Sequence, residues 1–284
     1  MLDLLFIVKA VIIAIVQGIT EFLPVSSTGH MIIAGDLIRF TSGNSSAEFR
    51  QMFEVVIQLG SIMAIVVLFW RKLWDLVISL FRKEESGIKF TKAIVMGTIP
   101  AFVLGVFFED LISKYLFRTV TVIAGLFIGA VLLILAEYKF RDKAVSFDVD
   151  EITWKQAIKI GLFQCLAMWP GMSRSSSTIV GGWISGLSSK TAAEFSFFLA
   201  IPVMFGASFI KIFKFQKEIG LDTLTSTETT AFLSGFIIAF LVALLCVKGF
   251  IAYIKTHPMR IFAYYRIAIS VLLTVLVITG VITV

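Results

Sequence analysis

Residues 17–30, QGITEFLPVSSTGH, place polar side chains inside a chain that is otherwise strongly apolar. The stretch carries an amide at Gln17, a carboxylate at Glu21, three consecutive hydroxyls and one of the 2 histidines of the chain. The 284 residues are 58% hydrophobic, with a mean hydropathy of +0.96, whereas soluble domains are about 45–50% apolar. We therefore expect an all-α polytopic membrane protein, in which a buried charge needs a partner or a function.

The apolar segments are of two kinds. In the regions 4–40 and 156–187, apolar stretches are interrupted midway by Pro, Gly, Ser and Thr, as LPVSSTGH and WPGMSRSSST. Broken helices at membrane depth are tolerated only where they are buried in protein or line a cavity. These two regions are therefore predicted to be re-entrant helix–loop–helix hairpins. Six uninterrupted runs are predicted to be spans: 53–70, 93–108, 119–138, 191–213, 231–254 and 261–283.

The chain also repeats itself. Four matches occur in the same order at nearly the same shift, pairing Gln17 with Gln164, Glu54 with Glu194, Gly97 with Gly235 and Arg118 with Arg260. A single integral membrane domain, 1–284, is predicted, made of a first repeat (1–145) and a second (146–284). Each repeat has one re-entrant hairpin and three spans. Because three is odd, the second repeat is inverted, as in membrane proteins with a binding site at the midplane.

The positive charges favour one orientation of these spans. Loops 71–92, 139–159, 188–190 and 248–260 fall on one face and carry 15 Lys and Arg. The opposite face, with both termini and the loops near 39–50, 109–118 and 211–230, carries 8. The richer face is expected to be cytoplasmic. Both termini are then outside, and the first hairpin opens to the outer face. Because the basic residues cluster in short loops, the net charge of +6 gives no indication of nucleic-acid binding.

The polar tips of the two hairpins indicate an anion site. Two helix N-termini that meet would present free backbone N–H groups and partial positive charge, and Arg174 adds a planar donor that suits phosphate oxygens. Beside a bound phosphate, Glu21, His30 and a hydroxyl such as Ser27 would supply a base, an acid and a nucleophile. The candidate phosphate-binding residues are Ser26, Thr28, Gly171, Ser173, Ser175 and Thr178.

Structural interpretations of the same residues stay open. Ser and Thr in membrane helices usually bond to a nearby carbonyl or a neighbouring helix, and Arg174 can be a counter-ion of Glu21 or Glu194. Glu54 and Glu194 occur near expected helix starts, where an acid complements the helix dipole. Arg266, in the last apolar run, is expected to pair with one of these acids or to extend toward the membrane surface. Cys165 and Cys246 are expected to be small buried side chains.

The two polar segments, QGITEFLPVSSTGH and PGMSRSSST, resemble the signature segments of the bacterial undecaprenyl-diphosphate phosphatases, also called the bacitracin-resistance family. The similarity extends to FEVVIQLGS, GTIPA and EFSFFLAIP. The resemblance implies an integral hydrolase of the bacterial plasma membrane that removes the terminal phosphate of undecaprenyl diphosphate. That reaction recycles the lipid carrier of peptidoglycan synthesis and confers bacitracin resistance. Its inverted repeats with two re-entrant hairpins agree with the pattern described above.

The resemblance also implies roles for residues. The acidic pair of the first signature falls on Gln17 and Glu21, and since Gln17 does not ionise, only Glu21 can act as a base there. These two residues, shared with substrate, are the candidate ligands of a divalent cation, Mg²⁺ or Ca²⁺, which is not expected to be a tightly bound structural metal. Ser27 is the favoured nucleophile, and His30 or an activated water is the alternative.

Partners and a second class of function also follow. A polyprenyl diphosphate and membrane lipids are the expected ligands, and a homodimer stays open. The alternative to a phosphatase is a transporter or flippase of a phosphorylated lipid or another anion, because inverted repeats with broken helices are also a transporter design.

Overall fold

The computed structural model describes residues 3–40, 47–116 and 118–280, and this part of the chain is helical, without a β-strand. Short 3-10 turns, among them η1 (Arg141–Lys143) and η3 (Leu166–Met168), join some of the helices. The α-helices in chain order are α1 (Leu4–Thr20), α2 (Ser27–Leu37), α3 (Ala47–Leu68), α4 (Trp70–Phe81), α5 (Glu85–Leu116), α6 (Thr119–Phe140), α7 (Trp154–Cys165), α8 (Arg174–Ile184), α9 (Ser189–Glu218), α10 (Ser226–Ile254) and α11 (Arg260–Ile278).

Six helical segments of the described chain are long and apolar enough to cross a membrane. Each contains or closely overlaps one of the six predicted runs, so the prediction of an all-α, multi-pass membrane protein is confirmed. The segments are Phe49–Leu68, Glu85–Phe108, Thr119–Lys143, Ser189–Glu218, Ser226–Ile254 and Arg260–Ile278.

The predicted loop 71–92 contains a helix that the sequence analysis missed. α4 has only 12 residues, which is too short to span a bilayer. Trp70 and Trp74 are about half exposed and stack at 5.7 Å, next to Arg71 and Lys72. Aromatic rings beside basic residues on a short helix are typical of a segment that lies along the membrane surface. The loop prediction failed because the segment's charges masked its helical pattern.

Of the two acids expected near helix starts, Glu194 lies near one and Glu54 does not. α3 already includes Ala47, so Glu54 lies two turns inside the helix and not at its start. Glu194 lies in the second turn of α9 and pairs with Lys190 at 3.6 Å. Part of the predicted loop 39–50, residues 41–46, and the chain ends 1–2 and 281–284 lie outside the described residues.

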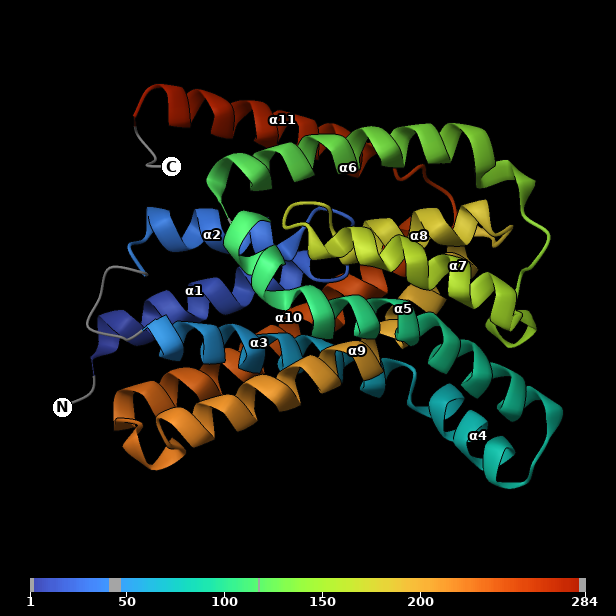
Figure 1. Cartoon of the computed structure of the whole chain (residues 1–284), viewed down its shortest axis with the longest axis horizontal. Coiled ribbons are helices and arrows are strands. Elements are labelled where there is room, and N and C mark those ends of the chain that lie inside the picture. Colours follow the sequence, from blue (N-terminus) through green and yellow to red (C-terminus); the bar gives the residue numbers. More distant parts are fainter. Residues whose placement is uncertain (1–2, 41–46, 117, 281–284) are drawn as a thin grey trace.

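Helices that are distant in the sequence lie side by side (Figure 1). α1 packs along α10, which also packs along α3, while α5 packs along α7 and α6 along α11. Some of these contacts bring backbones together: a Cβ on Gly161 of α7 would overlap the Gly97 carbonyl of α5. Small residues that allow such close approach are typical of helix packing in membranes. The breaks between α1 and α2 and between α7 and α8 meet inside the bundle.

A buried carboxylate joins the ends of α6 and α11. Glu137, which is 7% exposed, accepts hydrogen bonds from the backbone N–H groups of Met259 (2.6 Å) and Arg260 (2.8 Å). Arg141 donates to the same carboxylate at 3.1 Å. The free N–H groups of a helix start and its dipole favour a negative charge at this position. Glu137 therefore fixes the start of the last helix against α6.

Candidate active site

The first break separates α1 from α2. Ser26 is the N-cap of α2, and its hydroxyl accepts a hydrogen bond from the Gly29 N–H at 3.4 Å. Its backbone has φ 74° and ψ 93°, a region that residues other than glycine rarely adopt. A serine is held there because its side chain satisfies one of the free N–H groups of the new helix. The chain thus turns sharply before α2 and leaves the N-terminus of α2 facing the protein interior.

The second break has the same local geometry. Ser173 is the N-cap of α8, with φ 69° and ψ 119°, and its hydroxyl accepts from the Ser176 N–H at 3.3 Å. Just before it, Gly171 has φ +97°, and a Cβ there would overlap the Val122 carbonyl of α6. Ser26 and Ser173 are 147 residues apart, which is the shift between Gln17 and Gln164. The two helix starts therefore share their cap geometry, and the same shift of 147 residues relates both the caps and the glutamines before them.

Glu21, directly after α1, is the centre of a buried polar cluster. Its Oε2 accepts hydrogen bonds from Gln17 Nε2 and Ser27 Oγ, each at 2.8 Å. Its Oε1 forms an ion pair with Arg174 Nη2 at 3.2 Å. The carboxylate is only 7% exposed, so these donors are needed to compensate for the loss of water. The amide and the hydroxyl come from the first break, whereas the cation comes from the second.

Arg174 is anchored on its other side by α9. Its Nη1 donates to the Ser196 carbonyl at 2.9 Å, and the Ser196 hydroxyl shares a 2.6 Å hydrogen bond with Thr178. The Phe22 ring centroid lies 5.8 Å from Arg174 Cζ, within the range of a cation–π contact. Arg174 Nε is buried and has no hydrogen-bond partner among the residues that the structure describes. The guanidinium is thus fixed in orientation while this N–H group is left for a ligand.

A cavity of about 140 Å³ lies beside this cluster. Most of the predicted site residues line it, and the other lining residues are Gln58, Ala167, Pro170 and Met204. The predicted residues in the lining are Glu21, Ser26, Ser27, Thr28, Gly171, Ser173 and Arg174. Residues that are distant in the sequence therefore converge on one cavity.

Three other predicted residues support the cavity without lining it. Gln17 does not line the cavity but donates a hydrogen bond to Glu21, which does. Ser175 Oγ donates to the Leu23 carbonyl at 2.9 Å and so ties the second break to the first. Thr178 Oγ1 donates to the Arg174 carbonyl at 2.9 Å. Ser175 and Thr178 therefore bond to carbonyls of the protein, as expected for hydroxyls with a structural role.

His30 makes its contacts outside the described lining of the cavity. Its Nδ1 lies 2.8 Å from the Ser26 carbonyl, and its Nε2 lies 2.7 Å from the Tyr265 hydroxyl of α11. The two rings also stack, with centroids 5.5 Å apart. Because a carbonyl only accepts, Nδ1 carries the proton, and Nε2 then accepts from Tyr265. Both ring nitrogens are therefore engaged away from Glu21.

Arg266 lies in neither of the two environments expected from the sequence, an ion pair with an acid or the membrane surface. It is 0% exposed, so it does not extend to the membrane surface, and its hydrogen bonds in the described structure go to carbonyls and a hydroxyl instead of an acid. Nη2 donates to the carbonyls of Gly171 (2.9 Å) and Met172 (3.0 Å), and Nη1 to Ser176 Oγ (3.1 Å) and, more weakly, to the Pro24 carbonyl (3.5 Å).

The acceptors of Arg266 explain its position. Each Pro or Gly break frees backbone carbonyls that have no helical partner, and inside a membrane such groups need another donor. A guanidinium, with five N–H groups, can serve several of them at once. The sequence holds two signals for this role: two breaks that expose carbonyls, and an arginine in the predicted span 261–283, which contains no Asp or Glu.

The cluster offers oxygen ligands but no closed metal site. Among the described residues, no three His, Cys, Asp or Glu side chains gather where they could hold a metal ion. The oxygens available are the two of Glu21 and Gln17 Oε1, which is buried and has no hydrogen-bond partner in the described part of the chain. Carboxylate and amide oxygens are ligands that Mg²⁺ and Ca²⁺ prefer. The residues therefore fit a cation that is shared with a bound phosphate.

Comparisons with known proteins support the family resemblance inferred from the two polar segments. The family model described as bacitracin resistance protein BacA matches residues 10–272. A Clostridioides difficile protein named undecaprenyl-diphosphatase 2 is 50% identical, and the alignment covers 100% of this chain and 99% of that protein. Proteins named undecaprenyl-diphosphatase are 47% identical in Clostridium tetani (99% of this chain, 100% of that protein) and 46% identical in Clostridium perfringens (99% of each). The resemblance inferred from the two segments is confirmed, and the chain belongs to the bacitracin resistance protein BacA family.

Proposed function

We propose that the chain is an integral membrane phosphatase that converts undecaprenyl diphosphate to undecaprenyl phosphate and inorganic phosphate. Three similar proteins that match over nearly their whole length are named for this activity. The observation that carries the proposal is the contact of Ser27 Oγ with Glu21, whose other oxygen meets Arg174. The product is the lipid carrier of peptidoglycan synthesis, and membership in the family accounts for bacitracin resistance.

Ser27 is the nucleophile of the proposed reaction. Its Oγ, hydrogen-bonded to Glu21 at 2.8 Å, attacks the terminal phosphorus while Glu21 takes its proton. The bond from that phosphorus to the bridging oxygen breaks, and undecaprenyl phosphate leaves. Water then attacks the phosphoserine, Glu21 returns the proton to the serine oxygen, and inorganic phosphate departs. Because Gln17 does not ionise, Glu21 is the single base of this scheme.

Arg174 and the two helix starts stabilise the transferred phosphoryl group. Charge on its equatorial oxygens is matched by the guanidinium, by the free backbone N–H groups of α2 and α8, and by the hydroxyls of Ser26, Thr28 and Ser173. The unused Nε of Arg174 is a further donor. A cavity of about 140 Å³ is small beside the roughly 300–1,000 Å³ of pockets for whole small molecules. That size favours a headgroup phosphate and leaves the lipid chain outside.

His30 acts as a proton carrier or a positioning group and not as the nucleophile. Its protonated Nδ1 faces the Ser26 carbonyl and its Nε2 accepts from the Tyr265 hydroxyl, so no nitrogen lone pair is directed at a phosphorus beside Glu21. This arrangement favours Ser27 over His30 as the first atom bonded to phosphorus.

A divalent cation, Mg²⁺ or Ca²⁺, fits beside Glu21 and the free amide oxygen of Gln17. Mg²⁺ is usually held by one or two carboxylates together with substrate phosphates. When bound, the cation neutralises charge on the diphosphate and so makes the lipid phosphate a better leaving group.

The architecture we propose is an inverted repeat, 1–145 and 146–284, in which α1–α2 and α7–α8 are re-entrant hairpins. The matching backbone of Ser26 and Ser173 supports it. The helix packing supports it as well. In the proposed repeat, α7 corresponds to α1 and α5 corresponds to α10, and the pair α7–α5 packs together just as the pair α1–α10 does. The distribution of Lys and Arg favours both termini outside and a site that opens to the outer face.

A phosphate-release assay tests the proposed function. Purified protein in detergent should release phosphate from undecaprenyl diphosphate, a chelator should abolish the release, and added Mg²⁺ or Ca²⁺ should restore it. If the wild type binds the lipid but releases no phosphate under any of these conditions, the transporter or flippase interpretation replaces the enzyme.

A further inference from the structure

A second and larger hollow lies between α6 and the α7–α8 segment. Its volume is about 930 Å³, several times that of the phosphate cavity, and the two share no lining residue among those described. Its walls are mostly apolar side chains, including Leu132 and Leu135 of α6 and Val180 of α8. Leu135 is 59% exposed, so this groove is open along the surface that faces lipid.

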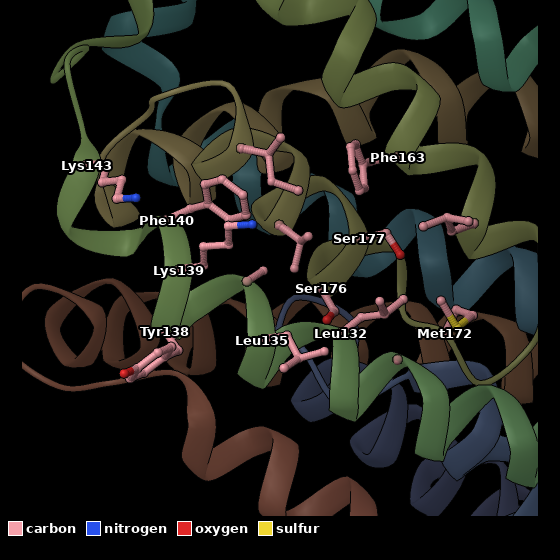
Figure 2. A pocket seen from close by; sticks show the side chains of 15 residues that line it. Leu132, Leu135, Tyr138, Lys139, Phe140, Lys143, Phe163, Met172, Ser176 and Ser177 are labelled. Carbon is pink, nitrogen blue, oxygen red and sulfur yellow. The ribbon is translucent and has the colours of Figure 1, made fainter.

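The two ends of the groove differ in charge (Figure 2). Lys139 and Lys143 lie at one end, while Met172, Ser176 and Ser177 lie toward the other. Both lysines are exposed, and none of the described residues in the lining is acidic. The Lys139 ammonium lies 5.5 Å from the Phe140 ring centroid. An anionic group at this end would meet two cations without competition from a carboxylate in the groove wall.

The position of the lysines matches the shape of a lipid. They lie at the end of the membrane-spanning segment Thr119–Lys143, at the level where a bilayer changes from chains to headgroups. From there the groove runs along α6 toward Ser177, which lies one turn into α8 beside the second break. A lipid has the same layout, with its phosphate at the interface and its chains directed to the midplane.

We propose that this groove binds one anionic phospholipid of the leaflet on the lysine-rich face, with the phosphate between Lys139 and Lys143. One acyl chain lies along Leu132 and Leu135 toward the break before α8. Because the groove is separate from the phosphate cavity, its occupant is a resident lipid and not the substrate. This site does not depend on the phosphatase activity.

Native mass spectrometry of the detergent-purified protein tests the site. The probes are phosphatidylglycerol and phosphatidylcholine with identical acyl chains. Wild type should bind one phosphatidylglycerol more tightly than phosphatidylcholine. In Lys139→Gln/Lys143→Gln, phosphatidylglycerol should bind about thirtyfold more weakly, since each lysine near the surface contributes roughly one kcal/mol of attraction to an anionic lipid. Lys155→Gln/Lys159→Gln removes two exposed lysines that do not line the groove and should leave the binding unchanged.

A second variant tests the chain-binding part of the groove. Leu135→Trp adds an aromatic ring to an exposed wall position, so binding of both lipids should fall at least about tenfold if a chain occupies the groove. An unchanged far-UV circular dichroism spectrum would confirm that both groove variants are folded.

Four results of the lipid-binding measurements would overturn the site. They are equal binding of the two lipids to wild type, equal losses in the Lys139/Lys143 and Lys155/Lys159 variants, unaltered binding in Leu135→Trp, or displacement of phosphatidylglycerol by an equal concentration of undecaprenyl phosphate. A dimeric species that excludes lipid would assign the groove to a second copy of the chain and would overturn the site as well.

Discussion

The two breaks have the same backbone but different side chains. Ser26 and Ser173 adopt the same rare conformation and cap their helices in the same way, so each break presents the N-terminus of a short helix. At the next position, however, the first break has Ser27 and the second has Arg174. The comparison teaches that two helix starts with the same backbone geometry differ in chemistry through the residue that follows the cap, which is a hydroxyl at one break and a cation at the other.

The largest expected effect is at the residue that distinguishes the first break. Ser27→Ala removes the proposed nucleophile, and kcat should fall by at least about 10⁴-fold, as for nucleophiles elsewhere. The comparison variant is Ser173→Ala, which removes a proposed phosphate-binding hydroxyl from the other break but not the attacking atom, and it should lower kcat by no more than about 10²-fold. Initial rates of phosphate release measure both. Quenching mid-turnover should trap phosphate on Ser27. Activity retained in Ser27→Ala would assign the first bond to His30 or to water.

The distinguishing residue of the second break comes next. Arg174→Ala should lower kcat by about 10³-fold, because donors directed at developing phosphoryl charge contribute that much. Arg174→Lys keeps a charge but loses the planar pair of donors to Glu21 and Ser196, so it should recover only part of the rate. The same rates in Arg174→Ala and wild type would show that Arg174 is a counter-ion of Glu21 and not a ligand of phosphate.

Arg266, which joins the two breaks, should affect stability more than chemistry. Arg266→Gln leaves the Gly171 and Met172 carbonyls without their donor, at a cost of about 2–4 kcal/mol, whereas Arg266→Lys should cost less. Gly129→Ala is an independent test, since a Cβ there would overlap the Arg266 guanidinium. Unfolding in mixed detergent micelles measures these losses. If Arg266→Gln unfolds like wild type, the carbonyls have another donor.

The caps themselves should give a smaller effect that is equal at the two breaks. Ser26→Ala and Ser173→Ala should each destabilise the protein by about 1–2 kcal/mol, since each loses a cap and keeps a backbone conformation unsuited to alanine. Glycine at either position should cost only a few tenths of a kcal/mol, because glycine adopts a positive φ freely. Unequal losses at the two positions would contradict the matched geometry.

A surface ion pair remote from both breaks provides the weakest test. Burial alone would raise the pKa of Asp148. Its hydrogen bond and ion pair with Lys72 (3.1 Å), together with hydrogen bonds from the backbone N–H groups of Asp150 and Val149, outweigh that effect and hold the pKa below its usual value. The pair therefore adds stability above the unfolded pKa, and the addition is lost as pH falls through the folded pKa. Because Asp148 is exposed, Asp148→Asn should cost under about 1 kcal/mol at pH 7, and the free energy of unfolding of variant and wild type should converge as pH falls through the folded pKa.

The sequence allowed much of the fold to be predicted, because long apolar runs and Pro-Gly breaks are local signals. The six spans and both breaks were found in this way, while α4 was missed because its charges masked its helical pattern. At the site, Glu21, Ser27 and Arg174 were predicted to act together, and the structure brings them into contact. The contacts of Arg266 and His30 could not be predicted, because both depend on where α11 packs, and that packing joins residues more than 90 positions apart.

The bonds of Glu137 have a consequence for the order in which the protein is made. Met259 and Arg260 donate their backbone N–H groups to this carboxylate, and Arg266 donates to the carbonyls of the second break. All three residues are synthesised after α6 and after the second break. Until α11 enters the membrane, α6 has an incompletely paired carboxylate and the second break has carbonyls without their donor. The insertion of α11 therefore completes the hydrogen bonding of two elements that enter the membrane before it.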